Sequence, residues 1–393
     1  MDIFSDISLV SRIETLRSGV FKLQIGLKQE DVALLYHRVE DAQNRFKDSP
    51  LSHVAGSLEK DVVVNSVFGT NTIEGGTLTV EETEAALSLS PEQIQNMEQQ
   101  RAYNLKQAYD FIKQVSVEED WQPSFDDVCE IHRLVYNGIE SDNPHNQPGV
   151  LRTNIDGYVT RVGNAQHGGV YKPPQLGQDI KLLLQSLLEW NQALAKSGVP
   201  ALIRAPLVHL YFELIHPFWD GNGRVARVLE AGILYADGFR YAPFAQANFY
   251  LKHIHRYFGT FNHCRKAADK KQPTPNHEFV TLFLEGMLET INHLHDRVNR
   301  LVHMVLFETN VKRLHDEGRI NERQYAIVNQ VLKLGAPVVL AELRKEPWYL
   351  ALYSKLTDKT KSRDLSNLKK LDLLVDLGEG KVAIVTHPVL EAL

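Results

Sequence analysis

Apolar residues recur at helical spacing along most of the chain, and this pattern predicts a mainly α-helical fold. In residues 28–47, one face collects Val32, Leu34, Leu35, Val39 and Ala42. The same spacing predicts further helices over 91–114, 124–135, 176–190, 200–214, 224–236, a stretch ending near 258, and 279–315. An apolar stretch at 65–68 is interrupted by Gly69 and then by Gly75-Gly76. Thr79 with Glu82 forms a capping box, which predicts a helix to Leu87.

Residues 138–174 lack this spacing and are rich in Gly, Asn, Asp and Pro. Within them, Asp156-Gly157 is a hairpin turn signal beside the β-favouring run 158–162. The segment is therefore expected to be a long loop with a short β-hairpin. Loops of this length usually have a function or are disordered.

Beyond Gly318 the pattern changes to three short predicted helices followed by a small hairpin. The helices are expected at 322–333, 338–345 and 358–370, and the strands at 373–375 and 382–385. This order predicts a winged-helix-like α+β module. The expected domains are 1–118, a core at 119–300, and a linker helix with the module at 301–393.

Charge and cysteine content exclude several classes of protein. The chain has 43 Lys and Arg against 49 Asp and Glu, a net charge of -6, so no strongly basic bulk surface is available for nucleic acid. Cys129 and Cys264 lie far apart, which argues against a disulfide scaffold or a thiolate zinc site. The amino terminus lacks the apolar run of a signal peptide, and no apolar run is long enough to span a membrane. A cytoplasmic protein is expected.

Residues 216–227, HPFWDGNGRVAR, carry the most informative chemistry. Pro217 ends the preceding helix, while Gly221 and Gly223 permit positive φ and close approach of a ligand. A helix restarting at about Arg224 would present backbone N–H groups to an anion such as phosphate.

The side chains of this segment add a base, a metal ligand and two cations. His216 can accept a hydroxyl proton near pH 7, and Asp220 supplies an oxygen ligand suited to Mg²⁺ shared with phosphates. Arg224 and Arg227 share one helix face and can bind phosphate oxygens. Each feature alone has a structural explanation, but the ordered combination favours a magnesium–polyphosphate site with a general base.

The segment resembles the signature of the Fic family, HPFx[D/E]GNGRxxR, at every specified position. The resemblance implies a Fic-type helical core from about 119 to about 287 and transfer of AMP from ATP to a Ser, Thr or Tyr hydroxyl of a target protein. It implies that His216 is the base and that Asp220 binds Mg²⁺ across the α- and β-phosphates. It further implies a nucleotide site made by Phe218, Asp220, Gly221, Asn222, Gly223, Arg224 and Arg227. Relatives that transfer phosphate carry Lys at the Gly223 position, so nucleotidyl transfer is favoured.

The resemblance also gives the long loop a role. Fic enzymes carry a hairpin flap that pairs with the target, and residues 158–171 stand where this flap is expected. Val170 and Tyr171 are assigned to it. Tyr257 falls near the family's aromatic pair beside adenine, although ordinary core packing explains it equally well.

A second motif lies upstream of the core. Thr70, Glu74 and Gly75 fit the pattern [S/T]xxxE[G/N], which in Fic proteins is inhibitory. In this interpretation Glu74 pairs with Arg227 and occupies the γ-phosphate position. The structural alternative is a capped helix end with an exposed glutamate. A further alternative is that Glu74 serves removal of AMP from modified targets.

Two further partners are considered, a second copy of the chain and DNA. A homodimer is expected. The basic helix at 358–370 could contact DNA phosphates, which would make the chain a nucleotide-sensing transcription regulator, or it could be a solvated face of an interaction module. His253-x-His255 and His293-x-His295 have the wrong spacing for one helix face and are interpreted as structural.

Overall fold

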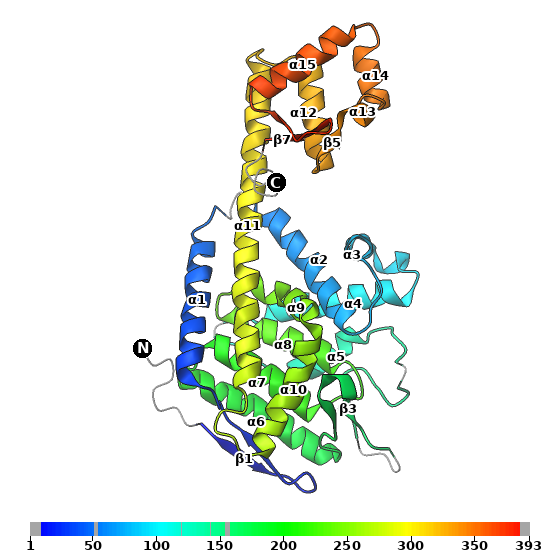
Figure 1. The fold of residues 1–393 in the computed structure, drawn as a ribbon. Helices are drawn as coiled ribbons and strands as arrows, with labels where there is room; N and C mark the ends of the chain where they lie inside the picture. Colours follow the sequence, from blue (N-terminus) through cyan, green and yellow to red (C-terminus); the bar gives the residue numbers. More distant parts are fainter. Residues whose placement is uncertain (1–8, 51–53, 119, 142, 154–157, 386–393) are drawn as a thin grey trace. The chain divides into compact units, whose positions relative to one another are not determined.

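The computed structural model describes residues 9–50, 54–118, 120–141, 143–153 and 158–385 (Figure 1). Within these ranges the protein is mainly α-helical, as the sequence predicts, with small antiparallel sheets. Residues 1–48 and 56–294 form one compact unit, and residues 295–393 make up most of a second. None of the described helices combines the length and the apolar character that a membrane crossing requires.

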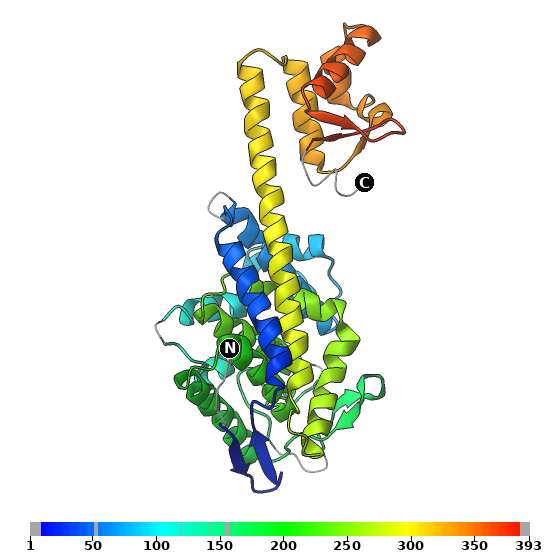
Figure 2. The same ribbon diagram turned by 60° about the vertical axis from the view of Figure 1, so that its left-hand side comes forward.

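Two buried helices lie at the centre of the first unit, α7 (Ala201–Ile215) and α8 (Asn222–Ala236). Side chains on nearly every face of α7 are buried, as expected of a helix inside a helical core. The other helices of the unit pack on this pair or on the helices next to it (Figures 1 and 2). They are α1 (Gln29–Lys47), α2 (Ala55–Ile73), α3 (Val80–Leu87), α4 (Met97–Val115), α5 (Phe125–Val135), α6 (Gly177–Lys196), α9 (Ala242–Lys252), α10 (Ile254–Asp269) and the first half of α11 (His277–Asp316).

Two short hairpins belong to the same unit. β1 (Ser11–Glu14) pairs with β2 (Val20–Leu23), and β3 (Val162–Asn164) pairs with β4 (Gly169–Tyr171) around the 3-10 turn η3 (Ala165–His167). The Asn262 side chain on α10 donates hydrogen bonds to the carbonyls of His167 at 3.0 Å and Gly169 at 2.7 Å. A hairpin is therefore present in the long loop and attached to α10, but it turns at 165–168, and of the β-favouring run 158–162 only Val162 lies in a strand. The Asp156-Gly157 turn signal lies outside the described residues.

Three predicted details are wrong. Helix α2 continues through Gly69 to Ile73, because Gly69 packs directly against Asn248 of α9 instead of ending the helix. The helix predicted at 91–114 is a 3-10 turn, η2 (Pro91–Gln93), and then α4, which starts after the Asn96 cap. Leu34 is exposed, because it lies two residues from Val32 and thus away from the buried face of α1.

The second unit follows the predicted order of elements with one addition. After the end of α11 come α12 (Glu322–Leu334), β5 (Val338–Val339), α13 (Leu340–Leu343), α14 (Pro347–Tyr353), α15 (Asp358–Lys370), β6 (Leu374–Asp376) and β7 (Lys381–Ile384). The sheet is antiparallel in the order β5-β7-β6. The predicted helix 338–345 is shorter, and α14 was not predicted; Pro347 at its first position favours a new helix start.

On α15, two of the basic side chains pair with carboxylates: Lys361 with Asp358 at 2.8 Å and Lys369 with Asp376 at 2.5 Å. Asp364 is buried and accepts a hydrogen bond from Arg323 of α12 at 3.0 Å. That contact fastens α15 to the core of its own unit. Binding of DNA by this helix stays a prediction.

Candidate active site

The loop between α7 and α8 takes its shape from two residues in the left-handed region and from one asparagine. His216 follows the end of α7 with φ 52°, and Gly221 precedes α8 with φ 80°. The Asn222 side chain accepts from the Phe218 N–H at 2.9 Å and donates to the Phe218 carbonyl at 3.0 Å. The side chain of Asn222, the first residue of α8, thus closes the loop 216–221.

Arg152 supports this loop from the protein interior, where it is 1% exposed. Its Nε donates to the His216 carbonyl at 2.6 Å, and the same guanidinium donates to the carbonyls of Pro174 and Ile215. Its backbone N–H donates to the Pro217 carbonyl at 2.9 Å. Burial lowers the pKa of Arg152 to about 10, so it remains charged at neutral pH. A positive charge therefore satisfies the orphan carbonyls at the end of α7.

His132 of α5 supports the other side of the loop. Its ring stacks on Phe218 with centroids 3.8 Å apart. Nδ1 accepts from the Gly149 N–H at 2.9 Å, so Nε2 carries the proton and donates to the Asp220 carbonyl at 3.1 Å. Burial lowers the pKa of His132 to about 4, which keeps the ring neutral.

Sequence reasoning missed both Arg152 and His132. For His132 the signal was its position one turn from Val128 and Val135 on the buried face of α5. For Arg152 we find no sequence signal.

A cavity of about 340 Å³ lies above this loop and is named the motif pocket. It is lined by most of the predicted site residues, namely Glu74, Tyr171, His216, Asp220, Gly221, Asn222, Gly223, Arg227 and Tyr257. The other predicted residues do not line it. Phe218 is buried in the stack with His132, Arg224 donates to the Tyr136 hydroxyl at 2.6 Å, and Val170 lines a neighbouring cavity.

His216 has an acidic neighbour that sequence reasoning missed. Its Nδ1 lies 3.6 Å from Oε2 of Glu213, one turn earlier on α7. Burial alone would raise the pKa of Glu213, but His216, His209 and Arg227 outweigh burial and lower it. The ionised carboxylate would stabilise a protonated imidazole. Because Nδ1 is buried on this side, Nε2 is the nitrogen left to accept a proton from the pocket.

Glu74 lies immediately after α2 and contacts the opening turn of α8. Its Oε1 pairs with Nη2 of Arg227 at 2.5 Å. Nη2 also lies 3.4 Å from the carbonyl oxygen of Thr70, whose hydroxyl is within 2.9 Å of the Tyr109 hydroxyl. A Cβ on Gly223 would overlap the Glu74 carboxylate, so the carboxylate rests directly on the backbone of α8. Gly75, at φ 85°, turns the chain away after it.

A chain of buried hydrogen bonds continues from Arg227 into the core. Arg227 Nη1 donates to the Tyr257 hydroxyl at 3.1 Å, and that hydroxyl lies 2.9 Å from His209 Nε2. His209 Nδ1 lies 2.7 Å from Glu230. Because Glu230 accepts, a neutral His209 donates through Nδ1 and accepts through Nε2, which leaves the Tyr257 oxygen free to accept from Arg227.

This chain also shifts pKa values at both of its pocket residues. Burial alone would lower the pKa of Arg227, but Tyr257 and Glu74 outweigh burial and raise it. Burial raises the pKa of Tyr257, which therefore stays a neutral phenol.

Three carboxylates line the pocket, but Glu74 pairs with Arg227 and Glu213 lies beside His216, which leaves Asp220 for a metal ion. The Asp220 side chain is 45% exposed, and its Oδ1 accepts from the Gly221 N–H at 2.6 Å and lies 3.7 Å from Arg224 Nη2. Among the described residues there is no group of three or more protein side chains that could bind a metal. A single exposed carboxylate fits Mg²⁺ held jointly by protein and phosphates.

Comparison with known proteins identifies a family that part of this chain matches. Residues 122–234 match the Fic/DOC family model. A protein adenylyltransferase Fic of Nematostella vectensis is 27% identical over 225 residues, which is 54% of this chain and 47% of that protein. This chain therefore aligns with less than half the length of that relative.

Two solved structures share the fold. A Fic domain-containing signaling protein from Bacteroides thetaiotaomicron has a TM-score of 0.54 at 19% identity, covering 68% of this chain and 96% of that one. A Fic family protein from Desulfovibrio desulfuricans has a TM-score of 0.53 at 17% identity, covering 90% and 95%. The complete motif at 216–227 lies within residues 122–234, so this part of the chain is a Fic domain.

Proposed function

We propose that this protein transfers AMP from ATP to a hydroxyl side chain of a target protein and that Glu74 restrains the transfer. The carrying observation is the Glu74–Arg227 ion pair at 2.5 Å on the wall of the pocket that also contains His216 and Asp220. Relatives named protein adenylyltransferase support the reaction type.

In the proposed reaction each pocket residue has a defined role. Nε2 of His216 takes the proton of the target hydroxyl, and the oxygen attacks the α-phosphorus of ATP. The new P–O bond forms as the bond to the β-phosphate breaks, and pyrophosphate leaves. Glu213 stabilises the imidazolium formed in this step. Backbone N–H groups at the start of α8 bind the phosphates.

Asp220 would hold Mg²⁺, which offsets negative charge on the phosphates when bound. Arg224 takes a different role from Arg227 in this proposal. Its guanidinium lies 4.8 Å from the Tyr136 ring and donates to the hydroxyl of that residue, so it braces the side of the loop that carries Asp220.

Restraint by Glu74 acts on the γ-phosphate end of the nucleotide. While Glu74 pairs with Arg227, the γ-phosphate loses that cation and meets a carboxylate on the α8 backbone. The triphosphate is then displaced from in-line geometry. A displacement of about 1 Å can lower a rate by about a hundredfold.

The test is labelling of the full chain with α-labelled ATP and Mg²⁺, followed by intact-mass spectrometry. We expect Glu74→Gly to raise self-modification by up to about a hundredfold over the wild type. Glu81→Gly, an exposed glutamate on α3, is the matched control and should label like the wild type. Equal labelling by the wild type and Glu74→Gly would refute the restraint, and no transfer by Glu74→Gly to itself or to any protein supplied would refute the reaction.

A further inference from the structure

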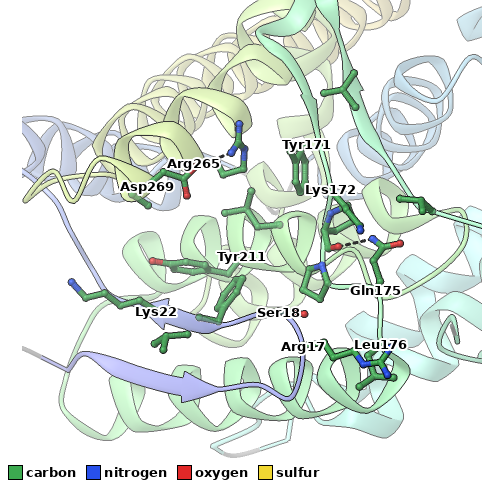
Figure 3. A pocket seen from close by; sticks show the side chains of 18 of the residues that line it. Arg17, Ser18, Lys22, Tyr171, Lys172, Gln175, Leu176, Tyr211, Arg265 and Asp269 are labelled. Atoms are coloured by element: carbon green, nitrogen blue, oxygen red, sulfur yellow. Dashed lines mark hydrogen bonds and ion pairs between the residues drawn. The ribbon is translucent and has the colours of Figure 1, made fainter.

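Cations line a hollow in each unit, but the two hollows differ in what lies between the cations. In the first unit, a cavity of about 910 Å³ beside β4 places Leu176 and Tyr211 among cations such as Lys22 and Arg265 (Figure 3). In the second unit, none of the described residues that line a hollow of about 390 Å³ is apolar. We call this second one the polar hollow. It offers nothing to an apolar side chain, whereas phosphate oxygens can accept hydrogen bonds from its cationic and amide groups.

The polar hollow lies between α15 and the turn that leads from α11 into α12. Its cations are Arg319, Arg363 and Lys370, and its other lining residues are Gly318, Asn321, Gln324, Asp364, Ser366 and Asn367. The Asp364 carboxylate is buried and already accepts from Arg323 at 3.0 Å. The three lining cations are exposed, and within the described ranges no carboxylate forms an ion pair with them. Three positive charges without a partner therefore surround one hollow.

The exposed face of α15 has the same character. After the first position of the helix, its exposed residues are Lys359, Ser362, Arg363, Ser366 and Lys370. Steps of three and four residues place them on one side of the helix, opposite the buried Leu365 and Leu368. The acidic first residue, Asp358, pairs with Lys361 at 2.8 Å. None of the exposed side chains of α15 is apolar, whereas a helix that docks on a protein presents apolar residues at this spacing.

The connection of α15 to the preceding helix is that of a DNA-binding helix pair. The four residues 354–357 join α14 to α15 (Figure 1). A helix-turn-helix has a connection of this length, and its second helix enters the major groove of DNA. The 13 residues of α15 extend over about 20 Å, and the major groove of DNA, about 12 Å wide, admits a helix. The major groove of duplex RNA is too deep and narrow for side chains to read, so the helix pair favours DNA.

The charge of this part of the chain points the same way. Residues 318–385 contain 12 Lys and Arg against 8 Asp and Glu, whereas the whole chain contains 43 against 49. Positive charge is thus concentrated in the second unit of an acidic chain. Contacts of Lys and Arg with phosphates release counterions, which supplies most of the affinity for DNA of any sequence.

We propose that the second unit binds duplex DNA, with the exposed face of α15 in the major groove and a backbone phosphate in the polar hollow. Arg319 and Lys370 bind that phosphate, and Lys359 and Ser362 lie on the face of α15 that enters the groove. The inference goes beyond AMP transfer, because the described residues of the motif pocket all belong to the first unit.

The test measures binding of the full chain to a labelled random-sequence DNA duplex of about 30 base pairs by fluorescence anisotropy. We expect a dissociation constant of about 10 μM or below at about 50 mM salt, and a slope of about -3 in the logarithm of affinity against that of salt concentration. Arg319→Gln with Lys370→Gln should weaken binding about tenfold and make the slope shallower by about 2. Lys312→Gln with Lys333→Gln, exposed lysines of the same unit outside the hollow, is the charge-matched control and should bind like the wild type.

An anisotropy that does not change at about 50 mM salt would overturn the proposal. So would equal binding by Arg319→Gln with Lys370→Gln and by the control, because the phosphate contacts would then lie elsewhere. Duplex RNA of the same sequence is the second probe. RNA binding as tight as DNA binding would show that α15 does not enter the major groove, which also contradicts the proposal. These measurements need no ATP, so their outcome is independent of labelling by Glu74→Gly.

Discussion

The loop 216–221 and Glu74, the residue after α2, both border the first turn of α8, yet they are held in place very differently. The loop has buried supports on several sides, among them Arg152, His132 and the Asn222 side chain. Glu74 contacts α8 through one ion pair, and its side chain is 27% exposed. Under the proposed function, the part that would present phosphates with fixed geometry is held by buried contacts, whereas the part that would block them is attached by a contact open to solvent.

The energies sharpen this contrast. A partly exposed ion pair contributes about 1 kcal/mol or less once solvent screening is counted. Turning a two-state restraint from almost fully on to almost fully off needs about 5.5 kcal/mol of differential stabilisation. The ion pair alone is therefore too weak to account for the restraint. If Glu74 restrains transfer as proposed, packing of α2 through buried residues such as Val67 and Ile73 would supply most of the restraint, and its release would then require α2 to move.

The largest expected effect concerns His216 in the loop 216–221. His216→Ala removes the proton acceptor and should lower AMP transfer by about 10²–10⁴-fold in the Glu74→Gly background. ATP binding measured by calorimetry should be unchanged, because the loop is shaped by Asn222 and Arg152 and not by the imidazole. Transfer that survives His216→Ala would mean that another group takes the proton.

A second prediction concerns the support under the loop. The pKa of His132 falls from near 6.5 in the unfolded chain to about 4 in the folded protein. The folded state favours the neutral ring, so its contribution to stability is complete above pH 6.5 and is lost as the pH falls toward 4. The loss amounts to about 3 kcal/mol.

Urea unfolding at several pH values between 7 and 4 measures this contribution. His132→Gln should show a smaller loss of stability over this range than the wild type. His263→Gln, at an exposed histidine of α10, is the control and should follow the wild type. A His132→Gln variant with the wild-type pH dependence would show that His132 is not the titrating group.

The residues that support the loop 216–221 could not be predicted from the sequence as the motif could. The motif 216–227 and the pairing of Glu74 with Arg227 were predictable, because each is carried by a contiguous pattern and a family resemblance. Arg152 and His132 act through contacts with backbone or with one neighbouring ring, and such contacts arise only when distant segments pack. Glu213 lies only three residues before His216, and its proximity could have been read from the sequence. The course of α2 through Gly69 was missed for the same reason as Arg152 and His132, since its cause lies on α9.

The third prediction tests whether packing of α2 against α9 keeps Glu74 in the position that restrains AMP transfer. A Cβ at Gly69 would lie 3.1 Å from the Asn248 backbone nitrogen and 2.5 Å from its side-chain oxygen, so Gly69→Ala should push α2 away from α9. We expect AMP transfer to rise by about tenfold and stability to fall by about 1 kcal/mol.

Gly56→Ala is the matched control on the same helix, because a Cβ there meets nothing within 4 Å. It should stabilise α2 slightly and leave transfer unchanged. Transfer and the urea midpoint are measured together. A Gly69→Ala variant that is destabilised but no more active than the wild type would show that the position of α2 does not set the restraint.

The smallest expected effect separates two roles for Tyr257. If its ring stacked on adenine, as the family resemblance implies, Tyr257→Phe would keep the ring and leave the kinetics unchanged. In the structure the residue is 1% exposed and its hydroxyl accepts from Arg227. Loss of that acceptor leaves Arg227 less fixed, at a cost of about 1 kcal/mol. We therefore expect Tyr257→Phe, in the Glu74→Gly background, to raise the KM for ATP about fivefold with little change in kcat.

Tyr250→Phe provides the comparison one step further along the same buried chain. Its hydroxyl donates to Glu230 and does not touch Arg227. The KM should therefore rise less in this variant than in Tyr257→Phe. If both variants raise the KM equally, the effect comes from general loosening of the core. If neither does, the Tyr257 hydroxyl has no part in positioning Arg227, and the chain of hydrogen bonds from Glu230 to the pocket serves stability alone.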